Sequence, residues 1–379
     1  MTPPKDETRH TQRHAVKAAV VRGVGDGFAV EELGIAEPIG REVLVEIRAS
    51  GLCHSDLHFA NLDFGIPFPA VLGHELAGIV LAVGSEVRDF TPGQHVAGSL
   101  VQFCGHCRAC LGGETFRCRA GMELMRGPEQ APRLTDAAGE PVLPMFGTAA
   151  FAERALVHEH QLVAIPDEIP FPQACVLGCA TVTGAGAAIN AAKVRPGESA
   201  AVIGVGGIGL NILSGARLSG AEIIIAIDLS DEKLALATRF GATHTVNSST
   251  TDPVAAVREI TGGGADHAFE AIGLAVTTTQ ALRMTRVGGQ VLLIGLHRPG
   301  TTTEIAMLED VITPQRTLTG VFMGSTNIKR DIPIYAKLYL QGRLNLDDLI
   351  SREISVHEID DAYEQLAAGQ IARSVITSW

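Results

Sequence analysis

The sequence lacks the features that would indicate a membrane, an export route or a nucleic-acid partner. None of its apolar runs approaches the roughly 20 residues of a membrane span, so no membrane association is expected. The N-terminal residues MTPPKDETRHTQRH are polar and contain no apolar signal-peptide core, which predicts a short flexible tail and permits a cytoplasmic location. Acidic residues outnumber basic residues by 42 to 30, which gives a formal net charge of −12. Such an acidic surface repels phosphate backbones, so nucleic acid is not expected as a partner.

The length and the cysteines favour a two-domain metalloprotein. A chain of 379 residues is long enough for two domains, because one domain typically takes roughly 100–200 residues. Its 46% of hydrophobic residues can bury an ample core. Of the 7 cysteines, four lie within the short segment 104–118. In a chain without export signals, this crowding favours metal ligation over disulfides.

One glycine-flanked stretch, residues 51–75, concentrates a thiol, imidazoles, a hydroxyl and the carboxylates of Asp56 and Glu75. Its Cys53 and His74 are ligand types that suit Zn²⁺. Taken singly, each residue is more often a buried free cysteine or a core histidine. A helix predicted to start near Gln173 supplies Cys179 as a third ligand, which completes a catalytic zinc site with one open coordination position. Cys175, in the same segment, is interpreted as core.

A second metal site is indicated by four cysteines in the pattern C-x2-C-x2-C-x7-C. They are Cys104, Cys107, Cys110 and Cys118. Four thiolates at this spacing can surround one Zn²⁺ tetrahedrally and leave no open position, which is typical of a structural site. Two local disulfides are the alternative, and a reducing compartment disfavours them.

A dinucleotide-binding fingerprint follows the short apolar strand predicted at Ser199–Ile203. The loop after this strand contains Gly204, Gly206, Gly207 and Gly209. The glycines allow a tight turn and a close approach of a pyrophosphate to the helix that follows. Asp228 ends the next predicted strand, where it would bind the adenosine ribose and disfavour the 2′-phosphate of NADP, so NAD is expected. Lys233 reaches the same ribose or belongs to a solvated helix face.

The remaining segments predict a strand-rich part and an α/β part. Alternating apolar and polar runs at 15–49 and 76–101 predict antiparallel strands. Residues 119–148, rich in Gly, Pro and charge, are predicted to form a long loop. Strands and helices alternate from residue 199 to a strand at Leu318–Met323, which predicts a doubly wound parallel sheet whose exposed edge is a candidate for subunit pairing. The tail 356–379 is expected to return to the first part.

Together these motifs resemble those of the zinc-dependent alcohol dehydrogenases of the medium-chain dehydrogenase/reductase family. The resemblance covers essentially residues 15–379 and rests on Cys53-His54-Ser55-Asp56 with His58, Gly73-His74-Glu75, the four cysteines, Gly178-Cys179, and Gly204–Gly209 with Asp228. It implies a GroES-like β-rich catalytic domain over 1–180 and 324–379, with a structural zinc lobe at 104–118. It also implies a Rossmann NAD-binding domain over 181–323. Two Zn²⁺ per subunit, one catalytic and one structural, would accompany NAD, and a cytoplasmic location is implied as well.

The resemblance also implies roles for individual residues. Cys53, His74 and Cys179 correspond to the catalytic zinc ligands, Asp56 to the carboxylate that orients His74, and Glu75 to a glutamate behind the metal. The family's proton relay and cofactor contacts fall on five further residues. Ser55 and His58 correspond to the relay, His54 and Arg373 to groups near the pyrophosphate, and Thr183 to a residue beside the nicotinamide.

The substrate is less well defined by the sequence. The long segment after Cys118 resembles the class I, class III and aryl-alcohol branches, which implies a homodimer, with a homotetramer as the alternative. The glutathione-dependent formaldehyde branch has an Asp and an Arg where this chain has Phe64 and Met122, and its neighbour Asp63 fits only after a one-residue shift. Seven apolar side chains are pocket candidates, although each is as readily core. They are Phe59, Phe64, Leu100, Met145, Phe146, Leu296 and Phe322.

Three functions are therefore compared. The first is the oxidation of a hydrophobic primary alcohol, aliphatic or aromatic, to its aldehyde, or the reverse. The second is glutathione-dependent formaldehyde (S-hydroxymethylglutathione) dehydrogenation. The third, from another class, is a catalytically silent scaffold that binds zinc and NAD. The intact ligand set and the intact relay pair favour an enzyme over a scaffold.

Overall fold

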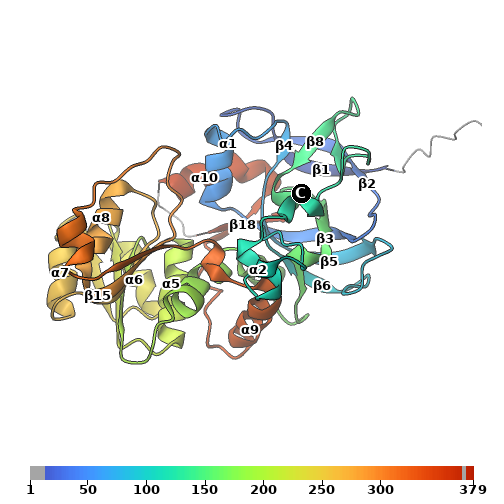
Figure 1. Cartoon of the computed structure of the whole chain (residues 1–379). Helices are drawn as coiled ribbons and strands as arrows, with labels where there is room; N and C mark the ends of the chain where they lie inside the picture. Colours follow the sequence, from blue (N-terminus) through green and yellow to red (C-terminus); the bar gives the residue numbers. More distant parts are fainter. Residues whose placement is uncertain (1–12, 369–372) are drawn as a thin grey trace, which may run out of the picture.

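A β-rich part and an α/β part make up the chain in the computed structural model, which describes residues 13–368 and 373–379. Figure 1 shows the α/β part, with its helices α5 to α8, on one side and the β-rich part on the other. The helices of the described residues are α1 His54–Asn61, α2 Arg108–Leu111, α3 Phe171–Cys175, α4 Ala180–Gly186, α5 Gly207–Leu218, α6 Asp231–Arg239, α7 Pro253–Ile260, α8 Ala275–Met284, α9 Ile328–Leu340 and α10 Ile359–Ala367.

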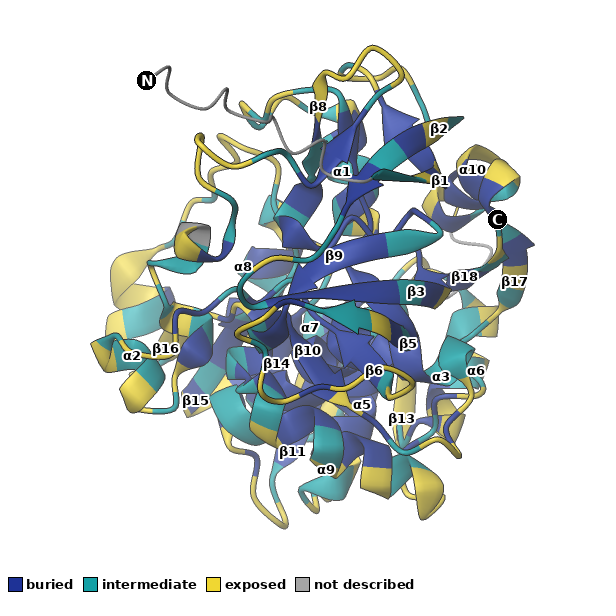
Figure 2. Cartoon of the chain, turned by 90° about the vertical axis from the view of Figure 1, so that its right-hand side faces the viewer, coloured by how far each residue is buried: buried dark blue, intermediate teal, exposed yellow. Residues whose placement is uncertain are grey.

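The β-rich part contains a small closed barrel and a larger sheet. The barrel order is β1-β2-β7-β8-β4, and the sheet order is β10-β6-β5-β3-β18-β17, with β9 paired to β3. Strands β3, β5 and β9 are largely buried, as Figure 2 shows, because they lie between the barrel and the rest of the molecule. These strands are β1 Arg13–Val21, β2 Ala29–Ala36, β3 Glu42–Gly51, β4 Ala70–Val71, β5 Glu75–Val83, β6 His95–Gly98, β7 Leu134–Thr135, β8 Pro141–Pro144, β9 Arg154–His158, β10 Leu162–Ala164, β17 Arg352–Ser355 and β18 Ser374–Ser378.

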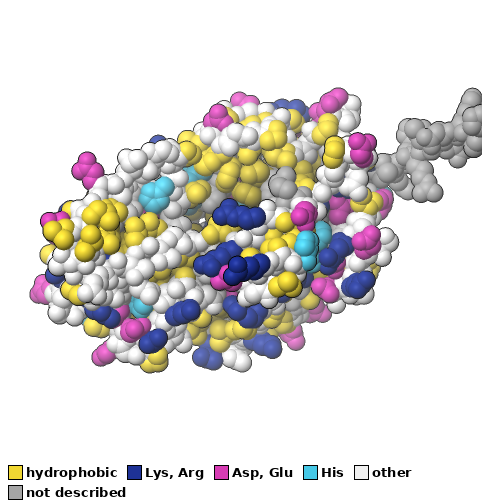
Figure 3. Space-filling model, in the orientation of Figure 1, with side chains coloured by type: hydrophobic (Ala, Val, Ile, Leu, Met, Phe, Trp, Pro, Cys, Tyr) yellow, Lys and Arg dark blue, Asp and Glu magenta, His cyan; other side chains and the backbone are white. Residues whose placement is uncertain are grey.

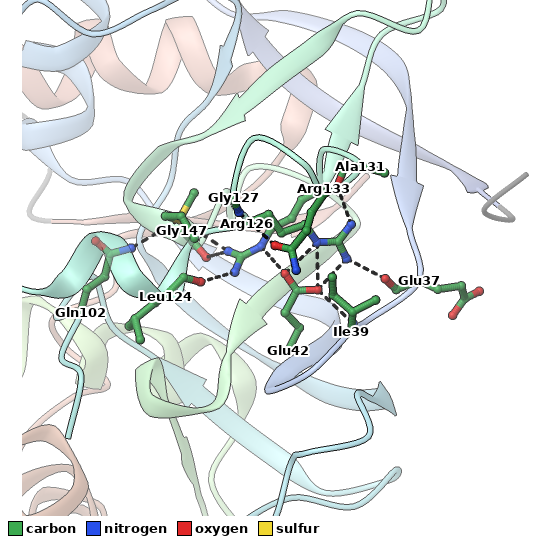
Figure 4. Close-up of polar contacts among 12 residues, drawn as sticks. Glu37, Ile39, Glu42, Gln102, Leu124, Arg126, Gly127, Ala131, Arg133 and Gly147 are labelled. Carbon is green, nitrogen blue, oxygen red and sulfur yellow. Dashed lines mark hydrogen bonds and ion pairs between the residues drawn. The ribbon is translucent and has the colours of Figure 1, made fainter. Parts of the chain in front are cut away.

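The segment 119–148, predicted as a long loop, is more ordered than expected. It contains 3-10 turns and the short strands β7 and β8, and β7 pairs with β2 through Gly34↔Thr135. Two arginines of this segment, Arg126 and Arg133, bind the buried carboxylate of Glu42 at the start of β3, as Figure 4 shows. The prediction of an irregular loop was therefore wrong for residues 134–135 and 141–144.

The α/β part is a six-stranded parallel sheet in the order β13-β12-β11-β14-β15-β16. This order confirms the predicted doubly wound fold. Helix α7 begins at Pro253, because the side chain of Asp252 accepts the amide of Val254 and Pro253 fits the first turn of a helix. The strands are β11 Ser199–Ile203, β12 Ile223–Asp228, β13 His244–Asn247, β14 Ala265–Glu270, β15 Thr285–Leu293 and β16 Thr317–Gly320.

The edge strand of this sheet is shorter than predicted. The sequence predicted a strand over Leu318–Met323, whereas β16 ends at Gly320. Beyond it the chain turns, and Met323 and Ser325 adopt left-handed φ values of 47° and 50°. Extended pairing cannot continue through such residues.

The C-terminal strand returns to the β-rich part, as the tail sequence predicted. Strand β18 pairs antiparallel with β3 through Val375↔Gly51. Helix α4, which begins at the predicted domain boundary, packs against α5, since a Cβ on Gly215 would lie 2.8 Å from backbone atoms of Ala185. The boundaries at 180/181 and 323/324 stay predictions.

No single helix among the described residues is long and apolar enough to cross a membrane. The bent pair of segments Phe171–Gly178 and Ala180–Ala192 passes the same test by length and composition. Most of its residues are buried in the protein core.

Candidate active site and structural metal centre

Four buried ligand-type side chains converge where three distant segments meet. They are Cys53, at the start of α1, His74 and Glu75, at the start of β5, and Cys179, between α3 and α4. One donor atom of each lies within 4.8 Å of the others, and all four residues are buried. The structure therefore brings together the three predicted ligands, and it adds Glu75 to the group.

Local backbone geometry explains how two of these side chains reach the site. Gly73 has a φ of 88°, and a Cβ there would lie 2.6 Å from the ring of Phe151, so only glycine lets the chain deliver His74 inward. Cys179 has φ −137° and ψ −70°, which interrupts the helical path before α4. Its thiol thus projects from a break between helices.

His74 is oriented by a buried carboxylate. Its Nδ1 donates to Oδ1 of Asp56 over 3.0 Å, and the same oxygen accepts the amide of Gly73 at 3.0 Å. The other ring nitrogen, Nε2, is buried and has no hydrogen-bond partner among the described residues. A ligating imidazole held by a carboxylate through its second nitrogen has this arrangement.

Burial and mutual contacts shift the pKa values of the side chains in the cluster. A hydrogen bond with Cys179, together with contact to His74, lowers the pKa of Cys53 well below its usual value. Burial raises the pKa of Glu75 to about 7, against the opposing charge of Arg373, whose Nη2 lies 3.3 Å from Oε1. A thiolate is the metal-binding form of cysteine.

The donor set fits a catalytic zinc ion. Two thiols and an imidazole correspond to the Cys₂His set that is known from the zinc site of alcohol dehydrogenases, which retains an open position for water or substrate. The Nε2 atom of His74 is buried and has no hydrogen-bond partner among the described residues. Leaving it unpaired is costly, and a zinc ion bound to it would supply the missing partner. Cys175 lies outside the group: its thiol is fully buried and donates to the carbonyl of Pro172, as expected for core.

The four cysteines of the 104–118 lobe also converge. Their nearest sulfur pairs are 3.5 to 4.0 Å apart, and all four residues are free cysteines. Four sulfurs at about 2.3 Å from a tetrahedral Zn²⁺ would be roughly 3.8 Å from one another. The geometry therefore fits one structural zinc ion, whereas disulfides would require S–S distances of about 2 Å.

The lobe borders a wide cleft that faces the edge of the parallel sheet. Its volume is about 1240 Å³, and four of its lining residues are basic: Arg117, Arg119, Lys193 and Arg330. Figure 3 shows Lys and Arg side chains gathered on this face of the molecule, over the region of α2 and α9. Two of the four are ion-paired, Arg117 with Glu114 and Arg330 with Asp331.

The glycine loop is shaped for a closely approaching ligand. Gly204 has a φ of 90°, and a Cβ on Gly209 would lie 1.9 Å from the carbonyl oxygen of Gly204. Helix α5 begins at Gly207, after the cap residue Gly206. A Cβ on Gly207 would lie 2.7 Å from Nη2 of Arg373, so this buried arginine reaches the start of the helix. Backbone amides and a cation there suit a pyrophosphate.

Asp228 lies at the carboxyl end of β12, beside the glycine loop. Its carboxylate accepts the amides of Val205 at 3.0 Å, Leu229 at 2.8 Å and Ser230 at 3.2 Å. These bonds fix the acid at the position expected for ribose recognition. Lys233 lies in the first turn of α6, and no polar contact of its side chain is found within the described part of the chain.

The predicted relay and nicotinamide residues are placed near the cluster without forming a continuous chain. Oγ of Ser55 lies 3.7 Å from Sγ of Cys53. His58 is half-buried on the same helix, and His54 is exposed at its start. Thr183 is buried on α4 and donates to Sδ of Met323 over 3.5 Å. No direct bond links Ser55 to His58 among the described residues.

Three of the seven pocket candidates form a connected aromatic wall beside His74. The ring centroids of Phe59 and Phe64 are 4.4 Å apart, and those of Phe59 and Phe146 are 5.1 Å apart. Phe146 presents an edge-on contact to the His74 ring at 5.4 Å. The others differ: Met145 is core, Leu100 is half-buried, and Leu296 and Phe322 are exposed.

One contact of the site was not predicted. The hydroxyl of Tyr363, on α10, donates to the backbone carbonyl of Cys53 over 3.2 Å. The two residues lie 310 positions apart, so no local pattern indicated the contact. Only the apolar periodicity of α10 signalled that one of its faces would be buried.

Comparisons with known proteins support this description. Residues 207–340 match the family profile described as zinc-binding dehydrogenase, and residues 40–167 match the alcohol dehydrogenase GroES-like domain. S-(hydroxymethyl)glutathione dehydrogenase of Paracoccus denitrificans is 35% identical over 95% of this chain and 99% of its own length. Geraniol dehydrogenase of Castellaniella defragrans is 36% identical over 96% of this chain and 97% of its own length. The crystal structure of benzyl alcohol dehydrogenase from Acinetobacter calcoaceticus superposes with a TM-score of 0.90, at 35% identity over 97% and 100%.

Replacing Cys107 by Ser should remove the structural metal. We expect the purified variant to hold about one zinc fewer per subunit and to unfold at a lower temperature, because metal binding contributes directly to folding. Elemental analysis and thermal unfolding measure both effects. Cys175→Ala is the matched control, since this free cysteine lies outside both groups. Unchanged zinc content and stability in Cys107→Ser would disprove the structural site.

Proposed function

Because this chain belongs to the zinc-dependent alcohol dehydrogenases of the medium-chain dehydrogenase/reductase family, we propose that it acts on a hydrophobic primary alcohol. The alcohol, aliphatic or aromatic, is oxidised to its aldehyde by hydride transfer to NAD, or the aldehyde is reduced in the reverse direction. The observation that carries this proposal is the aromatic wall of Phe59, Phe64 and Phe146 directly beside His74. Relatives named for geraniol and benzyl alcohol act on alcohols of this kind.

We propose two zinc ions per subunit, one in each cysteine-containing group. Cys53, His74 and Cys179 would hold the catalytic ion, and the four lobe cysteines the structural one. A zinc ion bound in this way is a Lewis acid that lowers the pKa of an alcohol hydroxyl. Asp56 keeps His74 in the tautomer and orientation that ligation needs. Glu75, buried behind the group, balances its charge together with Arg373.

The proton of the alcohol leaves through the chain's own hydroxyl and imidazole groups. Ser55 lies next to Cys53 and is the group proposed to accept the proton first. His58, one turn further along α1 and half-buried, passes it towards solvent. The two are not bonded to each other among the described residues, and a bound cofactor would supply hydroxyl groups that could pass a proton between them.

The cofactor is proposed to be NAD and to lie over the carboxyl ends of β11 and β12. When bound, it would supply the nicotinamide that takes up the hydride. The loop Gly204–Gly209 and Arg373 hold the pyrophosphate, with His54 at its edge, and Thr183 packs beside the nicotinamide. Asp228 binds the ribose hydroxyls, where its negative charge opposes a 2′-phosphate. Lys233 is a further candidate for the ribose.

Glutathione-dependent formaldehyde oxidation is the second candidate, because a relative with that name matches 95% of the chain. The aromatic contact of Phe64 with Phe59 opposes it. A glutathione adduct carries charged carboxylates, which gain nothing from an apolar wall. The aromatic wall therefore favours an uncharged, apolar alcohol.

The substrate class is tested by NADH formation with a panel of substrates. The panel is ethanol, hexan-1-ol, benzyl alcohol, a secondary alcohol, and formaldehyde with glutathione. We expect hexan-1-ol or benzyl alcohol to give the highest kcat/KM, because their apolar groups are buried on the aromatic wall. Turnover confined to formaldehyde with glutathione would establish the second candidate instead. Inactivity on every substrate, with zinc and NAD bound, would support the silent scaffold.

Replacing Ser55 by Ala should lower kcat by about 10²–10⁴-fold, the usual contribution of a positioned proton-transfer group. NAD binding should change far less than kcat, since the hydroxyl lies beside Cys53 and the glycine loop proposed to hold the pyrophosphate is untouched. Steady-state kinetics and cofactor titration separate the two effects. Ser85→Ala, at an exposed serine after β5, is the control. Full turnover in Ser55→Ala would refute the relay.

A homodimer is proposed from the exposed edge of the parallel sheet. All four residues of β16 are exposed, and the surrounding segment exposes Met307, Leu308, Ile312, Leu318 and Phe322. Unpaired strand edges and clustered apolar side chains are typical of subunit interfaces.

Light scattering should therefore give twice the mass of one chain for the wild type. Leu318→Lys should give a single chain, because a lysine on a strand edge opposes pairing. Leu340→Lys, at an exposed apolar residue of α9, should leave the dimer intact. A wild-type monomer would contradict the proposal, and four chains would indicate the homotetramer.

A further inference from the structure

A strained turn carries the aromatic ring that lies closest to His74. Phe146 has φ 55° and ψ 10°, and its neighbours Gly147 and Ala149 have φ values of 72° and 46°. Left-handed conformations are unfavourable for residues other than glycine, and they persist only where surrounding contacts impose them. Some part of the fold must therefore hold Phe146 in this conformation.

The turn is bonded to the segment that delivers His74. Oγ1 of Thr148 donates to the carbonyl of Gly73 at 2.8 Å, and the amide of Ala150 donates to the same carbonyl at 3.0 Å. Phe146 thus extends from a turn whose other end is fixed beside the metal-ligand group. Its ring meets the rings of His74 and Phe59 at interplanar angles of 80° and 85°.

Gln161 binds the backbone of this turn directly. Its side-chain amide donates to the carbonyl of Phe146 at 2.9 Å and to that of Ser99 at 3.0 Å. Gln161 is fully buried, so its two bonds have no competition from water. A Cβ on Gly147 would lie 2.9 Å from Oε1 of Gln161, which shows how closely the side chain packs against the turn.

Arg133 provides a second anchor, which Figure 4 shows. Its Nη1 donates to the carbonyl of Gly147 over 3.4 Å, its Nη2 to that of Leu124 over 2.7 Å, and its Nε to Glu42 over 2.7 Å. Although burial opposes ionisation, hydrogen bonds from Arg126 and the charge of Arg133 lower the pKa of Glu42. The guanidinium is thereby fixed between an ionised carboxylate and the turn.

Arg126 binds the same Glu42 carboxylate as Arg133 but makes no hydrogen bond to the turn at Phe146 and Gly147 in the described structure. It donates to both oxygens of Glu42, and its remaining bonds go to the carbonyls of Ala131 and Glu37. A role limited to stability would therefore belong to Arg126 and Arg133 alike. A role in placing Phe146 would belong to Arg133 and Gln161 only.

We infer that Gln161 and Arg133 are positioning residues that hold the Phe146 ring against His74 and so set a preference for aromatic over aliphatic alcohols. This inference rests on the proposed function, because the preference exists only if alcohols bind beside His74. A fixed ring edge offers a flat aromatic substrate an edge-to-face partner, whereas a flexible chain gains only apolar contact. Without the bonds from Gln161 and Arg133, the Phe146 ring is no longer held in place, and an aromatic substrate loses this edge-to-face contact.

Gln161→Met tests the inference, because it keeps the length of the side chain and removes the donor. Arg133→Lys is the second variant, since a lysine cannot reproduce the forked donation to Glu42 and two carbonyls. Binding of benzyl alcohol and of hexan-1-ol is measured by calorimetry in the presence of NADH, when no hydride can be transferred. The kcat/KM values for benzyl alcohol and hexan-1-ol and the zinc content of each variant are also measured.

Both variants should lower the preference for benzyl alcohol over hexan-1-ol by about three- to tenfold, the range expected for losing one aromatic pair. The zinc content should stay the same. Phe146→Leu should give a change of similar size, and combining it with Gln161→Met should add little further change. Arg126→Lys should lower the unfolding temperature and leave the preference unaltered.

The positioning role would be overturned if Gln161→Met and Arg133→Lys kept the wild-type preference for benzyl alcohol over hexan-1-ol while Phe146→Leu changed it. The proposed function would then remain intact. An equal change in Arg126→Lys would also overturn the positioning role, because it would show a general effect of stability. If the wild type binds neither alcohol beside NADH, the proposed substrate class and this inference both fail. Should Gln161→Met not fold, Arg133→Lys decides.

Discussion

The site depends on buried donor atoms that the protein brings together and does not satisfy by itself. Cys53, His74 and Cys179 come from three segments, and the Nε2 of His74 has no partner within the described residues. Burying such groups is unfavourable unless a cation binds them. The glycine before His74, the helix break at Cys179 and the carboxylate of Asp56 all serve to keep these donors in place.

The two parts of the molecule meet at one arginine. Arg373 donates to the carbonyl of Leu52 at 2.6 Å, pairs with Glu75, and reaches the start of α5 at Gly207. A single cation thus touches the backbone beside the metal-ligand group, the acid behind it and the start of α5. In the proposed complex the same side chain would face charge on the cofactor and charge in the metal-ligand group, which would couple the two sites electrostatically.

Much of this arrangement could be predicted from the sequence, because metal ligands and glycine turns leave local spacings. The lobe cysteines and the loop Gly204–Gly209 are examples, since each pattern is contained in a few residues. The strands β7 and β8 could not be predicted, because they are very short and pair with distant segments. Gln161 and Tyr363 donate to backbone carbonyls of residues 15 and 310 positions away in the chain. Because every residue has a backbone carbonyl, the sequence does not indicate which one will be bonded.

The pairing of β18 with β3 also determines the order in which the chain can fold. Trp379 donates to the carbonyl of Ile47, 332 positions earlier, and Val375 lies opposite Gly51. At about 5–20 residues per second, a ribosome needs on the order of tens of seconds to make the intervening chain. During that time β9 can already pair with Glu42–Glu46 of β3, but Ser50 and Gly51 at the end of β3 still lack their β18 partner, while the whole parallel sheet is synthesised and becomes able to close. The β-rich part is thus begun first and completed last, and its open edge is where nascent chains are exposed to wrong pairing.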